Sequence, residues 1–310
     1  MAQEIFSALP MRTWRWLGVN EALLPKELRQ PEALAEGPEQ ASGGSRGEIT
    51  KAEDAACTKK LNTACRTIHV PAGETMEAVV VYRKEQLTEI QADVAEGGTL
   101  NLVCVQMVPA DSAYAGSVTV TAGRNAKICY TAVEAGSSHT VTKLQIDLAG
   151  EGSIADVSAV YFGDKERRID MNYVISQIGK HTDANMQVRG ALQDASDKIF
   201  RGTLDFRRGS KGSTGREREE VILLDEGVRN RSVPLMMSGE DEVTGHHAVS
   251  AGRMNPDRLF YLMSRGMDEK EAQKLLVQAM FSPVLDRIPD AGLREEVAGS
   301  IEERITDGRS

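Results

Sequence analysis

Aromatic residues and cysteines are scarce in this chain of 310 residues. Aromatic side chains make up 5 % of it, which argues against a ligand cage built from stacked rings. The four cysteines, Cys57, Cys65, Cys104 and Cys129, form no CxxC pair and no second pair at zinc-finger spacing. We therefore expect reduced thiols that serve mainly as small buried hydrophobic residues.

Long apolar runs and an excess of positive charge are also lacking. No segment approaches the roughly 18 apolar residues that a membrane-spanning helix needs. The first residues contain no apolar core of signal-peptide length. The formal net charge is -9, so the chain has no general attraction for nucleic acid or anionic lipid. We expect a cytoplasmic protein that binds neither nucleic acid nor membrane.

Between about residue 66 and residue 250 the chain reads as a series of strands. Apolar and β-branched segments such as EAVVVYR, LNLVCVQMV and HTVTKLQIDLAG alternate with polar, glycine-containing turns. Four segments begin at Gly97, Gly123, Gly152 and Gly179, at steps of 26, 29 and 27 residues. The recurrence favours a mainly β solenoid of stacked parallel strands without helices longer than two turns. An irregular β-sandwich is the alternative.

Three regions follow from this pattern. Residues 1–47 are expected to form a helical segment around Trp14, Trp16 and Leu17, followed by a linker rich in glycine and serine. Residues 48–252 form the predicted solenoid core. Residues 253–310 carry helix signals and form a small C-terminal α-helical domain.

The helix signals in this last region are specific. Asn255 precedes Pro256 as an N-cap, and Asp268 with Glu271 has the spacing of a capping box. We expect the helix after Asp268 to bury one apolar face, and Ser282-Pro283 to begin another short helix. The expected face consists of Ala272, Leu275, Leu276 and Ala279. The last helix, 290–306, carries apolar residues at four-residue spacing: Leu293, Val297, Ile301 and Ile305.

Motifs of several enzyme classes are missing. No GxSxG motif is present, so the nucleophile elbow of many serine hydrolases is excluded. The loop 209–215 resembles a phosphate-binding loop only superficially, because its lysine precedes the Gly-Ser pair and a strand-like segment follows. Charged residues between 198 and 220 have both signs and indicate a mixed surface. A carbohydrate-active β-helix enzyme and a purely structural interaction module both stay open on these grounds.

The stretch 218–288 resembles the SufB/SufD family of the SUF system for iron–sulfur cluster assembly. Three motifs carry the resemblance: VILLDEGVRNRSVPLMM, GHHAVSAGR, and LFYLMSRGM followed by EAQKLL. The upstream segment 197–217 is also similar, and the resemblance covers roughly residues 50–290. It implies a right-handed parallel β-helix core with flanking helical parts, in agreement with the stacked strands.

The resemblance also implies roles for individual residues. In this family a histidine of the D-type subunit and a cysteine of the B-type subunit are implicated in cluster assembly at their interface. His247 falls on the family histidine, whereas His246 points to the opposite face of a strand. Glu219 and Glu220 stand where a B-type protein would offer its cysteine, and no cysteine follows Cys129. The resemblance therefore implies a SufD-like subunit.

A scaffold without catalytic residues is the function that this resemblance implies. The scaffold would bind no cofactor stably and would hold a transient iron–sulfur cluster, with His247 as the metal and cluster-assembly residue. Its partners would be SufC, an ABC-type ATPase, and a SufB-type subunit or a second copy. The residues expected on or directly beneath the ATPase-binding surface are Leu259, Phe260, Tyr261, Ser264, Arg265, Gly266, Glu271 and Leu275.

Overall fold

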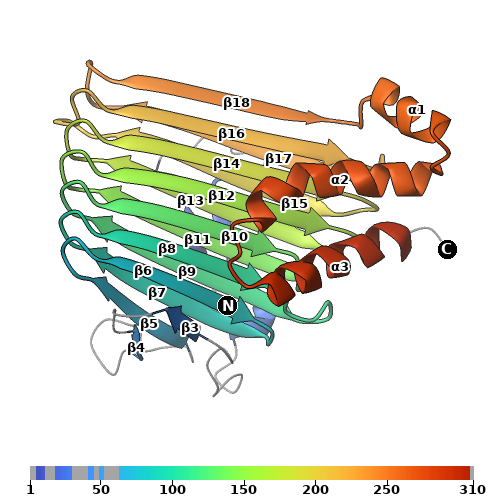
Figure 1. Cartoon of the computed structure of the whole chain (residues 1–310), viewed down its shortest axis with the longest axis horizontal. Coiled ribbons are helices and arrows are strands. Elements are labelled where there is room, and N and C mark those ends of the chain that lie inside the picture. The colour runs from blue at the N-terminus through green and yellow to red at the C-terminus, as the bar shows by residue number, and fades with distance from the viewer. Residues whose placement is uncertain (1–4, 11–17, 30–40, 45–48, 52–62, 308–310) are drawn as a thin grey trace.

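Stacked parallel strands form the body of the molecule. The computed structural model describes residues 5–10, 18–29, 41–44, 49–51 and 63–307. Successive strands alternate between two face-to-face sheets, so that each sheet takes every second strand (Figure 1). The strands are β5 (Thr63–Val70), β6 (Thr75–Tyr82), β7 (Gln86–Val94), β8 (Thr99–Gln106), β9 (Ala113–Ala122), β10 (Lys127–Glu134), β11 (His139–Leu148), β12 (Ile154–Gly163), β13 (Arg168–Gln177), β14 (Asp183–Leu192), β15 (Asp197–Phe206), β16 (Thr214–Leu223), β17 (Arg229–Ser238) and β18 (Thr244–Gly252).

The topology is that of a parallel β-solenoid. One sheet runs β18-β16-β14-β12-β10-β8-β6 and ends in the antiparallel strand β3 (Ala41–Gly44). The other runs β17-β15-β13-β11-β9-β7-β5 and ends in the antiparallel strand β4 (Ile49–Lys51). No helix lies between residues 66 and 250. The prediction of stacked parallel strands is therefore confirmed, and the sandwich alternative is wrong.

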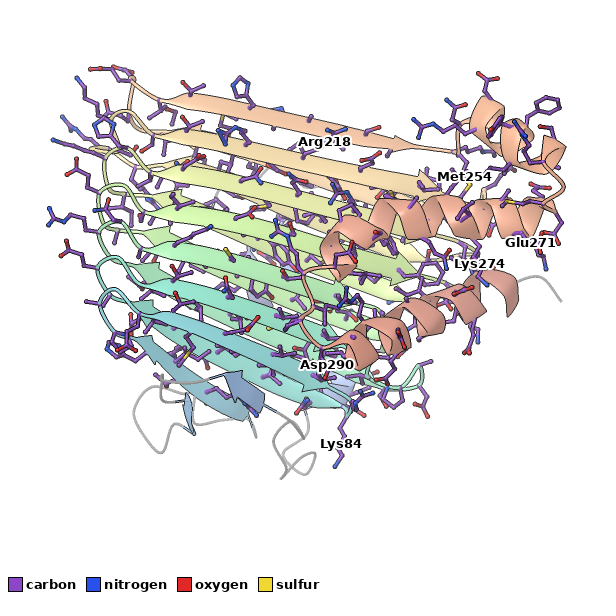
Figure 2. All side chains as sticks on the ribbon, viewed as in Figure 1. Lys84, Arg218, Met254, Glu271, Lys274 and Asp290 are labelled. Carbon is purple, nitrogen blue, oxygen red and sulfur yellow. The ribbon has the colours of Figure 1, made fainter. Side chains whose placement is uncertain are left out.

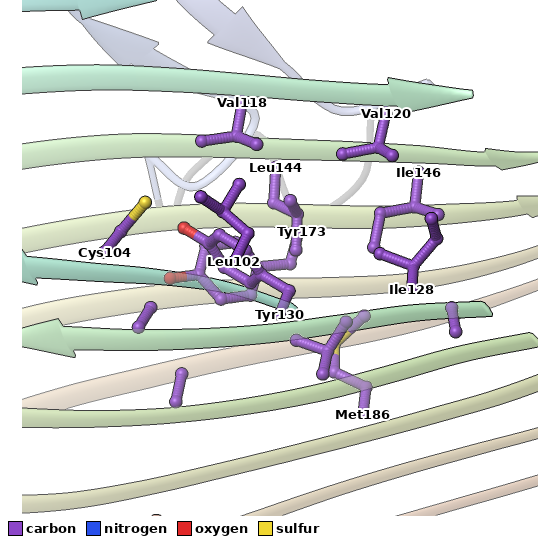
Figure 3. Close-up of a cluster of buried hydrophobic side chains, with 14 of the residues drawn as sticks. Leu102, Cys104, Val118, Val120, Ile128, Tyr130, Leu144, Ile146, Tyr173 and Met186 are labelled. Atoms are coloured by element: carbon purple, nitrogen blue, oxygen red, sulfur yellow. The ribbon is translucent and has the colours of Figure 1, made fainter. Parts of the chain in front are cut away.

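The core lies between the two sheets, where side chains of equivalent strands stack in register. Val118 pairs with Leu144 and Val120 with Ile146 in one sheet, and Leu102 pairs with Tyr130 in the other (Figure 3). These side chains are buried in one continuous apolar cluster. Burying each large apolar side chain contributes about 1.5–3 kcal/mol, so the stack stabilises itself rung by rung.

Three helices follow the last strand. They are α1 (Pro256–Ser264), α2 (Glu269–Leu285) and α3 (Ala291–Asp307). The predicted caps are confirmed: Asn255 accepts hydrogen bonds from the first turn of α1, and Asp268 and Glu271 form a reciprocal capping box. The apolar face predicted for α3 is also buried. It packs against α2 and the outer face of the sheet that contains the even-numbered strands β6 to β18.

Two predictions for α2 are wrong. Its buried residues are Ala272, Val277, Phe281, Val284 and Leu285, whereas Leu275 and Ala279 are exposed. The face that packs on β12 and β14 is thus rotated from the predicted one, because apolar residues occur on more than one side of this helix. Pro283 begins no new helix and lies within α2, where a proline near the helix end removes one backbone hydrogen bond.

The N-terminal region is described only in part, and the prediction of a helical segment around Trp14 is not tested there. Its described part forms an antiparallel pair, β1 (Ile5–Ala8) and β2 (Glu21–Leu23), and a 3-10 helix, η2 (Lys26–Arg29). These elements cover the outer face of the odd-numbered sheet, because Ala22, Leu24 and Leu28 pack on residues of β7, β9 and β11. The predicted residues Trp14, Trp16 and Leu17 lie outside the described residues.

The cysteines agree only in part with the expectation of reduced thiols. Cys104 and Cys129 are free, and burial raises the pKa of the Cys104 thiol to about 12, as expected for an unreactive core residue. Cys65, at the start of the solenoid, is disulfide-bonded, so the expectation is wrong at this position. Cys57 lies outside the described residues. No helix in the described ranges is long and apolar enough to cross a membrane.

Candidate functional site

Strand β18 forms one end of the solenoid. It is the terminal strand of its sheet and pairs only with β16 among the described strands. Eight of its nine residues are exposed. The neighbouring sheet ends in the same way with β17, so the last turn of the solenoid has no turn stacked on its outer side in the described structure (Figure 1).

His246 and His247 lie near the beginning of β18 on opposite faces. His247 is in register with Glu217 of β16, and His246 is in register with Arg216. Glu217 is buried between the sheets, whereas Arg216 is exposed. Because neighbours in register share a face, His247 stands on the interior side of the last turn and His246 on the outer side. Both histidines are exposed.

Glu217, the residue in register with His247, has an unusual environment. Glu217 is 2 % exposed, and neither of its carboxylate oxygens has a hydrogen-bond partner in the described structure. Burial, with a smaller contribution from the charge of Glu219, raises the pKa of Glu217 to about 8. Gly202 of β15 faces it, and a Cβ there would overlap with this carboxylate, so the glycine makes room for the acid.

A buried ion pair lies at the next inward position of the same strand. Lys198 and Glu219 are both fully buried and form a salt bridge. The Tyr161 hydroxyl donates to Glu219 at 3.0 Å, and Lys198 also donates to the Ser232 hydroxyl at 3.1 Å. Burial lowers the pKa of Lys198, while the neighbouring Glu219 opposes that shift. The interior of the last turns therefore contains a charged pair beside apolar residues such as Phe200 and Val221.

The sequence does not reveal these buried charges. It predicts a mixed surface for the charged residues 198–220, whereas Lys198, Glu217 and Glu219 are buried in the interior. Arg201 is buried on the outer face, where it donates to the carbonyls of Val19 and Glu21. In β16 the buried positions alternate strictly with exposed or half-buried ones, as the strand period requires. In the segment REREE both sets of positions carry charges, so alternation in hydropathy could not have identified the inward set.

The predicted ATPase-binding residues cluster on α1 and the first turns of α2. No residue of α1 is buried, and Phe260 and Tyr261 are 74 % and 56 % exposed. The Arg265 guanidinium lies 5.3 Å from the centre of the Tyr261 ring. The Ser264 hydroxyl donates to the Tyr261 carbonyl at 2.7 Å, and Gly266 takes a φ of 98° that favours glycine.

The remaining predicted residues support or extend this surface. Glu271 caps α2, and Leu275 is exposed one turn further along. Leu259 is half-buried and lines a groove of about 250 Å³ together with Met254 and Gln273. Figure 2 shows Met254 beside α1 and Glu271 on the neighbouring part of α2. The structure thus brings these predicted residues together on one exposed, partly apolar surface.

His247 does not belong to that surface. It lies near the start of β18, and α1 follows the opposite end of the strand (Figure 1). The two sets of predicted residues therefore form two separate sites. Within the described ranges, no three His, Cys, Asp or Glu side chains are grouped as a metal site. A metal ion at His247 would thus take at least part of its ligands from water or another molecule.

Comparison with known proteins identifies the family. A family model described as SUF system FeS cluster assembly, SufBD core domain, matches residues 56–280, which include β18 and α1. The chain is 27 % identical over 229 residues to the iron–sulfur cluster assembly protein SufD of Bacillus subtilis. That match covers 74 % of this chain and 51 % of the relative.

Two mycobacterial relatives extend the comparison. An iron–sulfur cluster assembly SufBD family protein of Mycobacterium leprae is 27 % identical over 59 % of this chain and 49 % of its own length. A protein of the same description from Mycobacterium bovis is 24 % identical over 77 % of this chain and 63 % of its own. The chain thus spans between about half and just under two thirds of the length of these relatives. It belongs to the SufB/SufD family of SUF-system iron–sulfur cluster assembly proteins and is SufD-like.

Proposed function

We propose that this chain is a non-catalytic scaffold subunit of a cytoplasmic SUF complex. It binds the ABC-type ATPase SufC and pairs with a SufB-type subunit or a second copy of itself. It binds no cofactor stably, and an iron–sulfur cluster is its transient cargo. The observation that carries this proposal is the SufBD core match over residues 56–280, which spans both candidate sites.

The surface of α1 suits a protein partner. Phe260, Tyr261, Met263 and Leu275 are all exposed large apolar residues on α1 and α2. Exposed aromatic side chains beside an arginine are typical of the residues that dominate binding at protein interfaces. SufC docks here, with Phe260 and Tyr261 as the apolar anchors and Arg265 as the charged contact.

The open end of the solenoid suits a second scaffold subunit. The outer edge of β18 presents backbone N–H and C=O groups that no described strand pairs. An edge of this kind is available for pairing with a strand of another chain. The partner's strand docks along this edge, which places His247 at the interface and supplies the missing metal ligands.

The helices provide a mechanical connection between the two sites. SufC moves α1 and α2 when it binds and hydrolyses ATP, and α2 packs directly on β12 and β14. ATP can act on the scaffold only through a difference in contacts between the two states of SufC. The movement changes how tightly the two scaffold subunits pair and opens their interface to iron and sulfur.

Co-expression tests this function. The full chain is produced with SufC and a SufB-type subunit from the same genome, and the complex is isolated through a tag on SufC. We expect the three proteins to elute together and to carry iron and sulfide after reconstitution. A chain that elutes alone, or that hydrolyses polysaccharides without SufC, would contradict the scaffold function.

A further inference from the structure

One acidic residue in the last turns of the solenoid lacks the partner that its buried neighbour has. Glu219 is paired with Lys198. Glu217 has no hydrogen-bond partner for either oxygen, although it is 2 % exposed. A buried polar group without a partner costs free energy, and a buried charge costs more. The fold thus holds two unused acceptor oxygens at a fixed place.

Register places Glu217 beside His247. The two residues are partners on adjacent parallel strands, so their side chains leave the sheet on the same face. Adjacent strands lie about 4.8 Å apart. The two side chains therefore start from neighbouring positions on the interior side of the last turn, and His247 is the exposed member of the pair.

The chemistry of the two groups indicates a metal ion. Imidazole nitrogen and carboxylate oxygen together suit divalent first-row metals, including iron(II), zinc and cobalt(II). We propose that Glu217 is the second metal ligand of this chain and binds one such ion together with His247 at the open end of the solenoid. The identification of the physiological ion as iron(II) rests on the proposed function, whereas the binding of a metal ion does not.

Two neighbouring groups are less suited to the site. His246 is on the outer face of β18, in register with the exposed Arg216. Glu219 already accepts hydrogen bonds on Oε1 from the ammonium of Lys198 and the hydroxyl of Tyr161, although its Oε2 has no partner. The opposite charge of Lys198 neutralises this carboxylate, so Glu217 is the better ligand. Water or a partner subunit would complete the site.

Cobalt(II) binding by the full chain without an affinity tag tests the inference. Cobalt(II) replaces iron(II) in sites of this type and gives visible absorption bands that report its ligands. We expect the wild type to bind one equivalent. Glu217→Gln keeps the shape of the side chain but removes the anionic ligand, and it should weaken binding by at least about tenfold. His247→Ala should weaken binding at least as much.

Two variants serve as matched controls. Glu220→Gln changes an acid of the same strand that is in register with Ser250 rather than with a histidine, and His246→Ala changes the adjacent imidazole. Both should bind cobalt(II) like the wild type. Unchanged binding in Glu217→Gln with weakened binding in His247→Ala would overturn the role of Glu217 and leave that of His247. A wild-type chain that binds no cobalt(II) would overturn the two-ligand site, while the scaffold function would stand.

Discussion

Arg304 in α3 donates two hydrogen bonds to Asp164, which lies in the turn after β12. Arg304 Nε donates to Oδ2 at 2.8 Å and Nη2 donates to Oδ1 at 2.6 Å. Arg167 donates to the same carboxylate at 2.7 Å. Burial alone would raise the pKa of Asp164, but the hydrogen bonds and charges of the two arginines lower it overall. This cluster attaches the last helix to the body of the solenoid.

We therefore predict that Asp164→Asn destabilises the protein strongly. The change removes the one negative charge that the buried Arg167 and the half-buried Arg304 share, and breaking a buried pair costs about 3–5 kcal/mol. Urea unfolding at pH 7 measures the loss. The control is Glu96→Gln, which breaks an exposed pair with Arg124 and should change the free energy of unfolding by less than about 1 kcal/mol. Equal effects of the two changes would contradict this role of Asp164.

The sequence predicted the helices and strands better than it predicted which of their residues face the core or stack on one another. Helix caps such as Asn255 depend on residues a few positions apart, so a local pattern reveals them. An alignment of the repeat on its four glycines matches the residues three positions later, which are Leu100, Ala126, Ala155 and Thr182. The structure instead stacks Leu100, Ile128, Ala155 and Ala184. Register between strands is decided by contacts between successive coils of the solenoid. The loops that connect the strands differ in length from one coil to the next, so a fixed spacing in the sequence does not give the register.

The candidate sites show the same limit. The exposed surface of α1 could be predicted because its motif resembles that of a known family. The partnerless Glu217 could not, because charges fill both faces of its segment and only the paired sheet decides which side is inward. Its relation to His247 depends on two strands separated by the whole of β17.

A second prediction concerns the buried acid Glu134, on β10 in the interior of the solenoid. Burial raises its pKa to about 8 from an ordinary value of 4.5. Between these pH values the folded chain keeps a proton that the unfolded chain loses, so the free energy of unfolding falls as pH rises. The contribution of this residue is on the order of 4 kcal/mol across that range.

Glu134→Gln should remove this dependence, because the amide does not titrate. Urea unfolding at several pH values from 4.5 to 8 should show a smaller decline in the variant than in the wild type, with the largest gain in stability at pH 8. The buried Cys104 nearby does not titrate in this range, because burial raises its pKa to about 12. Glu151→Gln, at an exposed turn, should leave the profile of the wild type unchanged. An unaltered slope in Glu134→Gln would refute the assignment.

The third prediction tests the docking surface on α1. Arg265→Glu reverses a charge beside Phe260 and Tyr261 and should weaken SufC binding by at least about tenfold. The variant loses only an exposed contact with the Tyr261 ring, worth about 0.5–1 kcal/mol, so its melting temperature should change little. Pull-down on immobilised SufC measures binding. Arg124→Glu, at an exposed turn of the solenoid, is the matched charge reversal and should bind normally. Unaltered binding in Arg265→Glu would show that SufC docks elsewhere.

The last prediction concerns His247 in the assembled complex. His247→Ala should leave folding and SufC binding intact, because the side chain is exposed and lies at the opposite end of β18 from α1. Iron and sulfide bound per complex after reconstitution should fall severalfold, since loss of one ligand weakens a metal site by on the order of tenfold or more. His246→Ala removes an imidazole from the outer face and should retain the cluster content of the wild type. If both variants retained it, cluster assembly would not depend on His247. A ligand at an exposed strand end can be removed without disturbing the core. A loss of folded protein in His247→Ala would therefore show that this histidine has a structural role instead.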